Sequence, residues 1–259
     1  MQNILAKKST LYIKNGVALF IGNLKDNAGH KHHSIQLVIS NSDSSFHIET
    51  GDDSVESKSY FINSNITHKV SSNNGSIMLL LLEPESYYGE LIAQALQNSH
   101  QHINLSTDLL TTINKAHYAD DFCINNVIEA IFKALNIKLD LKSTEDKRII
   151  KVINFISNLN NKVVKPSKLA KIVHLSESRL QHLFKQKKGL SIKRYLLWKK
   201  MIDGVNAVIS GNNFTFAAHE AGFSDSAHMS RTFKAMFGLK LSSIFKDSSS
   251  VQVIIEKES

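Results

Sequence analysis

The first 82 residues alternate between short apolar stretches and clusters of Gly, Asn, Asp and Ser. The apolar stretches are residues 11–13, 17–21, 34–40, 46–48 and 77–82. Short strands separated by regular turn signals are typical of an all-β sandwich or barrel. We therefore predict that the first part of the chain is rich in β-strands.

The period of the apolar positions changes after residue 87. Apolar residues then recur three and four positions apart, as on one face of a helix, within residues 91–96, 124–135 and 149–156. No stretch after Asp146 is predicted to be a strand, so we expect the second half to be all-α. The predicted fold class is α+β with two domains, residues 1–142 and 143–247, followed by a tail of residues 248–259.

The two predicted domains differ in charge. The whole chain has a net charge of +8, but residues 1–142 hold 11 basic and 14 acidic side chains, whereas residues 143–247 hold 19 basic and 7 acidic ones. A strongly basic domain favours a polyanion as its partner. On charge alone, a lysine-rich face that contacts only solvent is the alternative.

The basic domain contains an internal repeat. The matching positions are Leu169-Ala170, Leu175-Ser176, Leu180, Phe184-Lys185 and Gly189 in one copy, and Ala217-Ala218, Phe223-Ser224, Met229, Phe233-Lys234 and Gly238 in the other. Each copy predicts a helix, a tight turn and a second helix, with Ser176 or Ser224 as N-cap and Gly189 or Gly238 as a left-handed C-cap. This is the helix-turn-helix pattern, whose second helix can enter the major groove of DNA.

Each predicted second helix has an apolar stripe and a polar stripe. The apolar stripe is expected to be core and consists of Leu180, Leu183, Phe184, Met229, Phe233 and Phe237. The candidate DNA-contacting residues are Ser178, Gln181, His182, Lys185, Ser226, Ala227, His228, Ser230 and Arg231. Gln can pair with adenine and Arg with guanine through two hydrogen bonds each. If only one such helix were present, its polar stripe would be interpreted as an ordinary solvent-exposed face. Two related helices in a basic domain favour DNA binding instead.

Residues 222–234, Gly-Phe-Ser-Asp-Ser-Ala-His-Met-Ser-Arg-Thr-Phe-Lys, closely resemble the signature of the arabinose-regulator (AraC/XylS) family of bacterial transcription factors, and residues 175–185 do so as well. The resemblance covers about residues 145–246, with both motifs at the family's spacing. It implies two helix-turn-helix units, joined by one long linker helix, that contact adjacent segments of the major groove. The base-facing positions of the family fall on Ser178, Gln181, His182, Ser226, Ala227, His228 and Arg231. Lys185 and Ser230 are candidates for contacts with the DNA backbone.

The chain departs from the family pattern at two positions. Leu241 stands where Pro is usual, so the final turn is expected to be less rigid. Gly204 stands in the linker helix where Ala is usual, which costs about 1 kcal/mol of helix propensity. We expect this glycine to loosen the coupling between the two helix-turn-helix units.

Many members of that family carry a cupin-like β-barrel and dimerisation helices before the DNA-binding domain, and residues 1–136 resemble this arrangement. The candidate effector-binding residues are His30, His32, Gln36 and His68. Metal-binding cupins hold one ion with a His-x-His pair, an acidic residue and a later His. We expect the three histidines to lie close together, because the strand pattern around them would bring the two segments side by side. Because Gln36 stands near the place of the acidic residue, we expect no tightly held metal. We predict no metal site and no cofactor.

Other chemistry is weakly represented in the sequence. It has no Gly-rich phosphate loop, no Cys cluster and no Ser nucleophile motif, so no catalytic residue is predicted. Cys123 is the single cysteine, which excludes an internal disulfide. The longest apolar run, residues 77–82, is far shorter than the ~20 residues that span a bilayer, and the N-terminus lacks a signal-peptide pattern.

These patterns predict a cytoplasmic, nucleoid-associated transcriptional regulator that is not an enzyme and has no membrane partner. Its expected partners are double-stranded DNA, a small effector, a second copy of the chain and, if it is an activator, RNA polymerase. Dimerisation would use the apolar face of the helix at residues 125–136, although packing on its own domain explains that face equally well. The alternatives are a cupin-type metalloenzyme, an oxygenase or isomerase, fused to a DNA-binding domain, and a ligand-independent dimeric DNA-binding protein.

Overall fold

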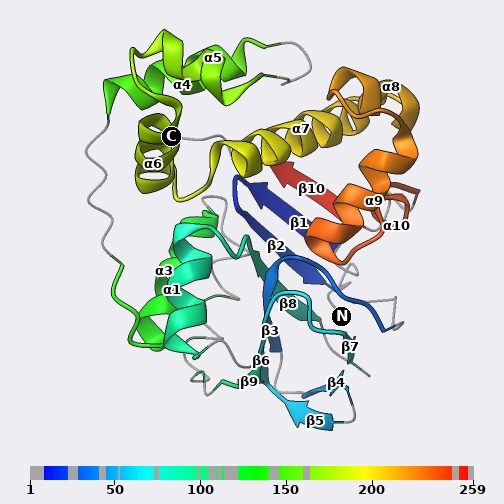
Figure 1. Ribbon diagram of the computed structural model, residues 1–259. Coiled ribbons are helices and arrows are strands. Elements are labelled where there is room, and N and C mark those ends of the chain that lie inside the picture. The colour runs from blue at the N-terminus through cyan, green and yellow to red at the C-terminus, as the bar shows by residue number, and fades with distance from the viewer. Residues whose placement is uncertain are drawn as a thin grey trace.

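The computed structural model contains two β-sheets, built mainly from strands of the first half of the chain (Figure 1). The structure describes residues 9–22, 29–40, 45–51, 53–72, 76–97, 100–103, 105, 109, 113, 122–139, 146–159, 164–246 and 251–255. The larger sheet has seven strands in the order β10-β1-β2-β8-β3-β6-β9, and the smaller sheet has the order β5-β4-β7. The strands are β1 (Ser9–Lys14), β2 (Val17–Gly22), β3 (Ile35–Ser40), β4 (Phe46–Thr50), β5 (Asp53–Ser57), β6 (Ser59–Ile62), β7 (His68–Ser71), β8 (Ile77–Leu82), β9 (Gln101–His102) and β10 (Val251–Ile255).

The five apolar stretches of the first half all form strands, as predicted. In β2, β3 and β8 every residue is buried, because these strands lie inside the larger sheet and are covered on both faces. The prediction of no strand after Asp146 is wrong. Strand β10 comes from the tail and pairs in parallel with β1, so that Val251 lies opposite Ser9 and Ile255 opposite Ile13.

The two faces of the larger sheet belong to two different hydrophobic cores. Leu19, Leu37 and Leu80 point to one face and pack with helices α1 (Tyr87–Ala95) and α3 (Ile124–Ala134). Their neighbours Phe20 and Leu79 point to the other face, because successive side chains of a strand alternate between faces. This second core also includes the smaller sheet and runs without interruption into the interior of the helical half.

The second half is helical, as predicted, as far as α10. Its helices are α4 (Lys147–Ser157), α5 (Pro166–Ile172), α6 (Glu177–Lys188), α7 (Ile192–Ile209), α8 (Phe214–Glu220), α9 (Ser226–Phe237) and α10 (Leu241–Lys246). Figure 1 shows α7 as the long central helix, with α4 to α6 at one end and α8 to α10 at the other. The predicted boundary at residues 142–143 lies outside the described residues. No helix in the described ranges has the length and apolar character needed to cross a membrane.

Gly204 packs tightly in α7, contrary to the expectation that it loosens the linker helix. A Cβ atom at this position would lie 2.7 Å from Met229 Sδ and 3.3 Å from Ala221 Cβ. The missing side chain therefore allows the second helix-turn-helix unit to approach the linker helix closely. A larger residue would improve the helix propensity at this position but would collide with Met229 unless its side chain moved.

Glu83 joins the two halves of the chain. Its carboxylate is buried and accepts hydrogen bonds from Arg194 and from Trp198 Nε1, at 2.9 Å for the latter, both on α7. On the side of the first half, His33 Nε2 lies 3.0 Å from Glu83 Oε1 and 3.1 Å from Glu85 Oε2. Burial opposes ionisation of Glu83, but the hydrogen bonds from His33 and Arg194 outweigh it and lower its pKa to about 2.

Two further contacts hold the helical half against the sheets. Gly189 ends α6 in a left-handed conformation, and a Cβ there would lie 2.9 Å from Tyr87 Cβ at the start of α1. Gly238 ends α9 in the same way, and a Cβ there would lie 2.5 Å from His32 Cδ2. Both predicted C-caps are therefore confirmed, and both also allow a close approach between the two halves.

We expect Phe233→Ala to lower the free energy of unfolding by about 3–5 kcal/mol, because the ring is fully buried and its removal leaves a cavity. Phe216→Ala is the matched control, since this ring on α8 is 50% exposed and should change stability by no more than about 0.5 kcal/mol. Urea unfolding of both variants measures the difference. Equal losses in the two variants would contradict the assigned core.

We expect Glu83→Gln to lower stability by about 3 kcal/mol at pH 7, because it leaves the charge of Arg194 without its buried partner. Glu85→Gln is the control, since Glu85 contacts the same His33 but is about half exposed and should cost at most about 1 kcal/mol.

The same pair of variants tests the pH dependence. Because the pKa of Glu83 is lowered from 4.5 to about 2, its stabilising contribution is complete above pH 4.5 and is lost as the pH falls toward 2. Thermal unfolding between pH 7 and pH 3 should therefore show a smaller acid-induced loss in Glu83→Gln than in the wild type. Parallel curves would show that Glu83 is not held ionised by the fold.

Candidate nucleic-acid interface

The first helix-turn-helix unit consists of α5 and α6. Ser176 caps α6 as predicted, since its hydroxyl accepts a hydrogen bond from the Arg179 backbone N–H at 3.2 Å. Leu180, Leu183 and Phe184 are buried, which fixes the orientation of the helix. The predicted DNA-contacting residues of this helix are all exposed, namely Ser178, Gln181, His182 and Lys185.

The second unit consists of α8 and α9, and its N-cap differs by one residue from the prediction. Asp225, not Ser224, caps α9 by accepting a hydrogen bond from the His228 backbone N–H at 2.6 Å. This hydrogen bond is the main reason why the pKa of Asp225 is lowered. Ser224 Oγ instead lies 3.0 Å from both Asp225 Oδ2 and His228 Nδ1, so it holds the His228 ring in place.

The outward side of α9 carries the remaining predicted DNA-contacting residues. Ala227, His228 and Arg231 are exposed, whereas Ser226 and Ser230 are partly exposed. Met229, Phe233 and Phe237 are buried behind them. Each second helix therefore presents its candidate residues on the side opposite its core, and α7 connects the two units (Figure 1).

Lys185 and Gln181, like His228, already have partners within the chain. Lys185 Nζ lies 2.6 Å from Glu90 Oε1 on α1, so an ion pair links the first unit to the first half. Gln181 Nε2 donates to Glu177 Oε1 one turn earlier, at 3.2 Å. The role of Glu90 has no local signal in the sequence, because the two ion-paired residues are 95 positions apart.

The structure also brings the predicted effector-binding residues together. His30 and His68 form an isolated antiparallel bridge, with both backbone N–H···O distances at 2.9 Å. The ring of His68 lies 4.6 Å from that of His30 and 5.0 Å from that of His32, measured between centroids. Gln36 is buried beside them, and its Oε1 lies 2.9 Å from His32 Nε2.

Burial decides the charge of two rings of this cluster, those of His32 and His68. His32 and His68 are only 3% and 2% exposed. Burial lowers the pKa of His32 to about 3, assisted by the nearby His68, and burial lowers the pKa of His68 to about 4. Both rings are therefore neutral near pH 7. The neighbouring His33 behaves in the opposite way, because its hydrogen bond with Glu83 raises its pKa.

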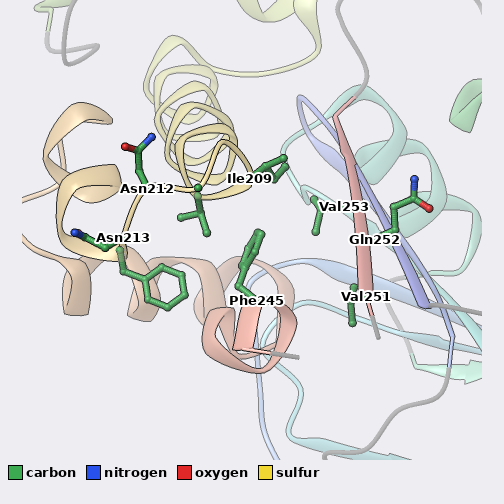
Figure 2. Close-up of a pocket in the computed structure, with 10 residues that line it drawn as sticks. Ile209, Asn212, Asn213, Phe245, Val251, Gln252 and Val253 are labelled. Carbon is green, nitrogen blue, oxygen red and sulfur yellow. The ribbon is translucent and has the colours of Figure 1, made fainter. Parts of the chain in front are cut away.

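A separate cavity of about 670 Å³ lies where the tail meets the second helix-turn-helix unit. Figure 2 shows Ile209 and Asn213 from α7 and the start of α8, Phe245 from α10, and Val253 from β10 around it. The three clustered histidines are not among its lining residues. The predicted effector-binding residues and this cavity are therefore two different places in the fold.

Comparison with known proteins agrees with the tandem helix-turn-helix assignment. Residues 169–247 match a family described as a helix-turn-helix domain, and this span includes α6 to α10. The probable transcriptional regulator LumQ of Photobacterium leiognathi is 24% identical over 190 residues, which cover 70% of this chain and 75% of LumQ.

Solved structures extend the likeness of fold to both halves. Two crystal structures of ToxT from Vibrio cholerae, one of strain O395 and one of an apo variant from strain SCE256, each align with a TM-score of 0.51. Each alignment covers 90% of this chain and 98% of ToxT, at 8% and 10% sequence identity respectively. The helix-turn-helix family match and the similarity to LumQ agree with the two capped helix-turn-helix units and support the prediction of an AraC-type DNA-binding transcriptional regulator.

Proposed function

We propose that α6 and α9 read adjacent major-groove segments of one DNA site. Ser178, Gln181 and His182 contact bases in one segment, and Ser226, Ala227, His228 and Arg231 do so in the other. Lys185 and Ser230 contact the DNA backbone. The observation that carries this proposal is that both helices present these residues outward, opposite fully buried apolar stripes. The excess of basic side chains in residues 143–247 supports it, since phosphate contacts supply much of DNA affinity.

We further propose that the first half regulates this activity. It corresponds to a cupin-like sensing and dimerisation domain that binds a small effector at His30, His32, Gln36 and His68. The supporting observation is that this buried cluster touches Gly238 at the end of α9, so an effector there would act directly on the second unit. A second copy of the chain, and RNA polymerase if the protein is an activator, complete the proposed partners at the nucleoid in the cytoplasm.

Regulation by binding, not catalysis, is the proposed role of the first half. The family consists generally of regulators without enzymatic activity. The histidine cluster also lies against the end of α9, which suits a switch. The ligand-independent alternative differs in one respect, since in it the first half only dimerises and no small ligand changes DNA affinity.

We expect Arg231→Ala to cost about 1–3 kcal/mol of binding free energy on a site selected from random double-stranded DNA, and less on unselected DNA, because a base contact is lost. Gln181→Ala should do the same over the other half of the site. Lys185→Ala is the control, since loss of a phosphate contact weakens both DNAs equally and reduces the salt dependence. Fluorescence anisotropy at several salt concentrations measures all three. If Arg231→Ala behaves like Lys185→Ala, Arg231 contacts the backbone.

We expect Glu90→Gln to raise DNA affinity about two- to five-fold, because it releases Lys185 from an ion pair whose strength is typical of exposed pairs. Glu129→Gln, which removes an equal charge from the exposed side of α3, is the control. The gain should disappear when Glu90→Gln is combined with Lys185→Ala. A gain that persists in the double variant, or that Glu129→Gln reproduces, would show that net charge alone is responsible.

A further inference from the structure

The three clustered histidines are arranged so that their ring nitrogens converge. One ligand nitrogen from each of His30, His32 and His68 lies within 4.8 Å of the others. The His32 and His68 rings are nearly perpendicular, at 88°, and the bridge between His30 and His68 fixes the two backbones. Rings whose backbones are held in this way form a preorganised set of nitrogen ligands, unlike side chains that are scattered over a surface.

The hydrogen bonds of the two buried rings define which nitrogen carries a lone pair. His32 Nε2–H donates to Gln36 Oε1 at 2.9 Å, so Nδ1 is unprotonated. His68 Nδ1–H donates to the Ile66 carbonyl oxygen at 2.9 Å, so Nε2 is unprotonated. Within the described part of the chain, His32 Nδ1 and His68 Nε2 are buried and have no hydrogen-bond partner. Two buried acceptors without a donor cost free energy unless a cation or a donor is bound.

Both unpartnered atoms are acceptors, and this excludes an anion as the ligand. An anion would be repelled by the lone pairs, whereas a divalent transition-metal ion takes them directly. Neutral imidazole is the form of histidine that binds such an ion. Gln36 and the Ile66 carbonyl then act as the outer partners that orient metal-bound histidines.

We propose that His30, His32 and His68 bind one divalent transition-metal ion of the zinc type, and that this ion is the effector of the regulator. The inference rests on the proposed effector site and names its ligand. It departs from the expectation that Gln36 excludes a metal, because the structure uses Gln36 to orient His32. The second histidine-carboxylate group, His33 with Glu83 and Glu85, is less suitable because Glu83 is already bound by Arg194 and Trp198.

The position of the cluster couples metal binding to DNA binding. A Cβ at Gly238 would lie 2.5 Å from His32 Cδ2 and 2.8 Å from His30 Nε2, so the end of α9 rests on two of the ligands. The residues that follow His32 bind the last turn of the same helix: His33 N–H donates to the Ala235 carbonyl at 2.8 Å, and Ser34 Oγ donates to that of Met236. An ion on these histidines therefore fastens the second unit to the first half. It favours the arrangement in which Glu90 holds Lys185, and so it weakens DNA binding.

Metal binding is tested on the full chain after treatment with EDTA and desalting. Isothermal titration with ZnCl₂ should show one tight site per chain, and Co²⁺ should give a visible absorption spectrum of a site with nitrogen ligands. We expect His30→Gln and His32→Ala each to weaken Zn²⁺ binding by on the order of 100-fold. His47→Ala, which removes an exposed histidine on β4, is the control and should leave the tight site intact. Equal Zn²⁺ affinity in the wild type and both cluster variants would overturn the proposal.

A second variant guards against loss of fold in the alanine substitution. Gln36→Glu places a carboxylate on His32 Nε2, which makes the imidazole a stronger ligand, so Zn²⁺ should bind about 10-fold more tightly. Unchanged or weaker Zn²⁺ binding in a folded Gln36→Glu protein would count against the site.

The regulatory step is measured separately, by anisotropy on a selected DNA site with and without saturating Zn²⁺. We expect Zn²⁺ to weaken DNA binding by at least about 5-fold in the wild type and not in His30→Gln. No change in the wild type would overturn the effector role. Selective DNA binding by the metal-free wild type tests the proposed function independently of the metal. If the metal-free protein does not bind DNA selectively, base contacts by α6 and α9 are contradicted, whatever the effect of Zn²⁺.

Discussion

A buried carboxylate, Glu83, fixes the relation between the sheets and the helices of this regulator. It follows strand β8 directly and reaches α7, where Arg194 and the Trp198 indole donate to it, while His33 contacts it from its own side. A buried charge is tolerated only when its partners are in place. Glu83 therefore stays ionised only while the two halves keep this arrangement. The partners that it needs are on α7, the linker helix of the DNA-binding half.

The shared sheet strengthens this dependence. Strand β10 follows the last helix of the DNA-binding half and yet lies beside β1, so the chain closes on the sheet where it began. The core on that face runs from the sheets into the helices without interruption. Since one continuous core and one buried ion pair connect the halves, the first half can influence the position of both helix-turn-helix units.

Each helix-turn-helix unit has its own contact with the first half. Lys185 on α6 pairs with Glu90 on α1, and Gly238 at the end of α9 rests on His30 and His32. Such contacts can transmit an effect only if a ligand binds the two arrangements of the halves with different affinity. The histidine cluster suits this requirement, because two of its three rings, those of His30 and His32, also contact the end of α9.

The sequence by itself determined the features that depend on neighbours a few residues apart. The caps at Ser176, Gly189 and Gly238, the buried stripes of α6 and α9, and the apolar strands could all be predicted, because helix and strand periods and capping hydrogen bonds are local. The paired motifs likewise indicated two helix-turn-helix units. Strands β5, β6, β7, β9 and β10 were missed, since β5 is mostly exposed and the others are four residues or fewer or lie in the tail.

Only the tertiary structure decided the contacts between distant residues. Glu83 and Arg194 are 111 positions apart, and Lys185 and Glu90 are 95 apart, so no periodicity could pair them. Gly204 is a second example. Its low helix propensity can be read from the sequence, whereas its close packing with Met229 exists only in the folded chain. The sequence could place the three histidines near one another, but which ring nitrogens lack partners depends on the hydrogen bonds with Gln36 and Ile66, and thus on packing.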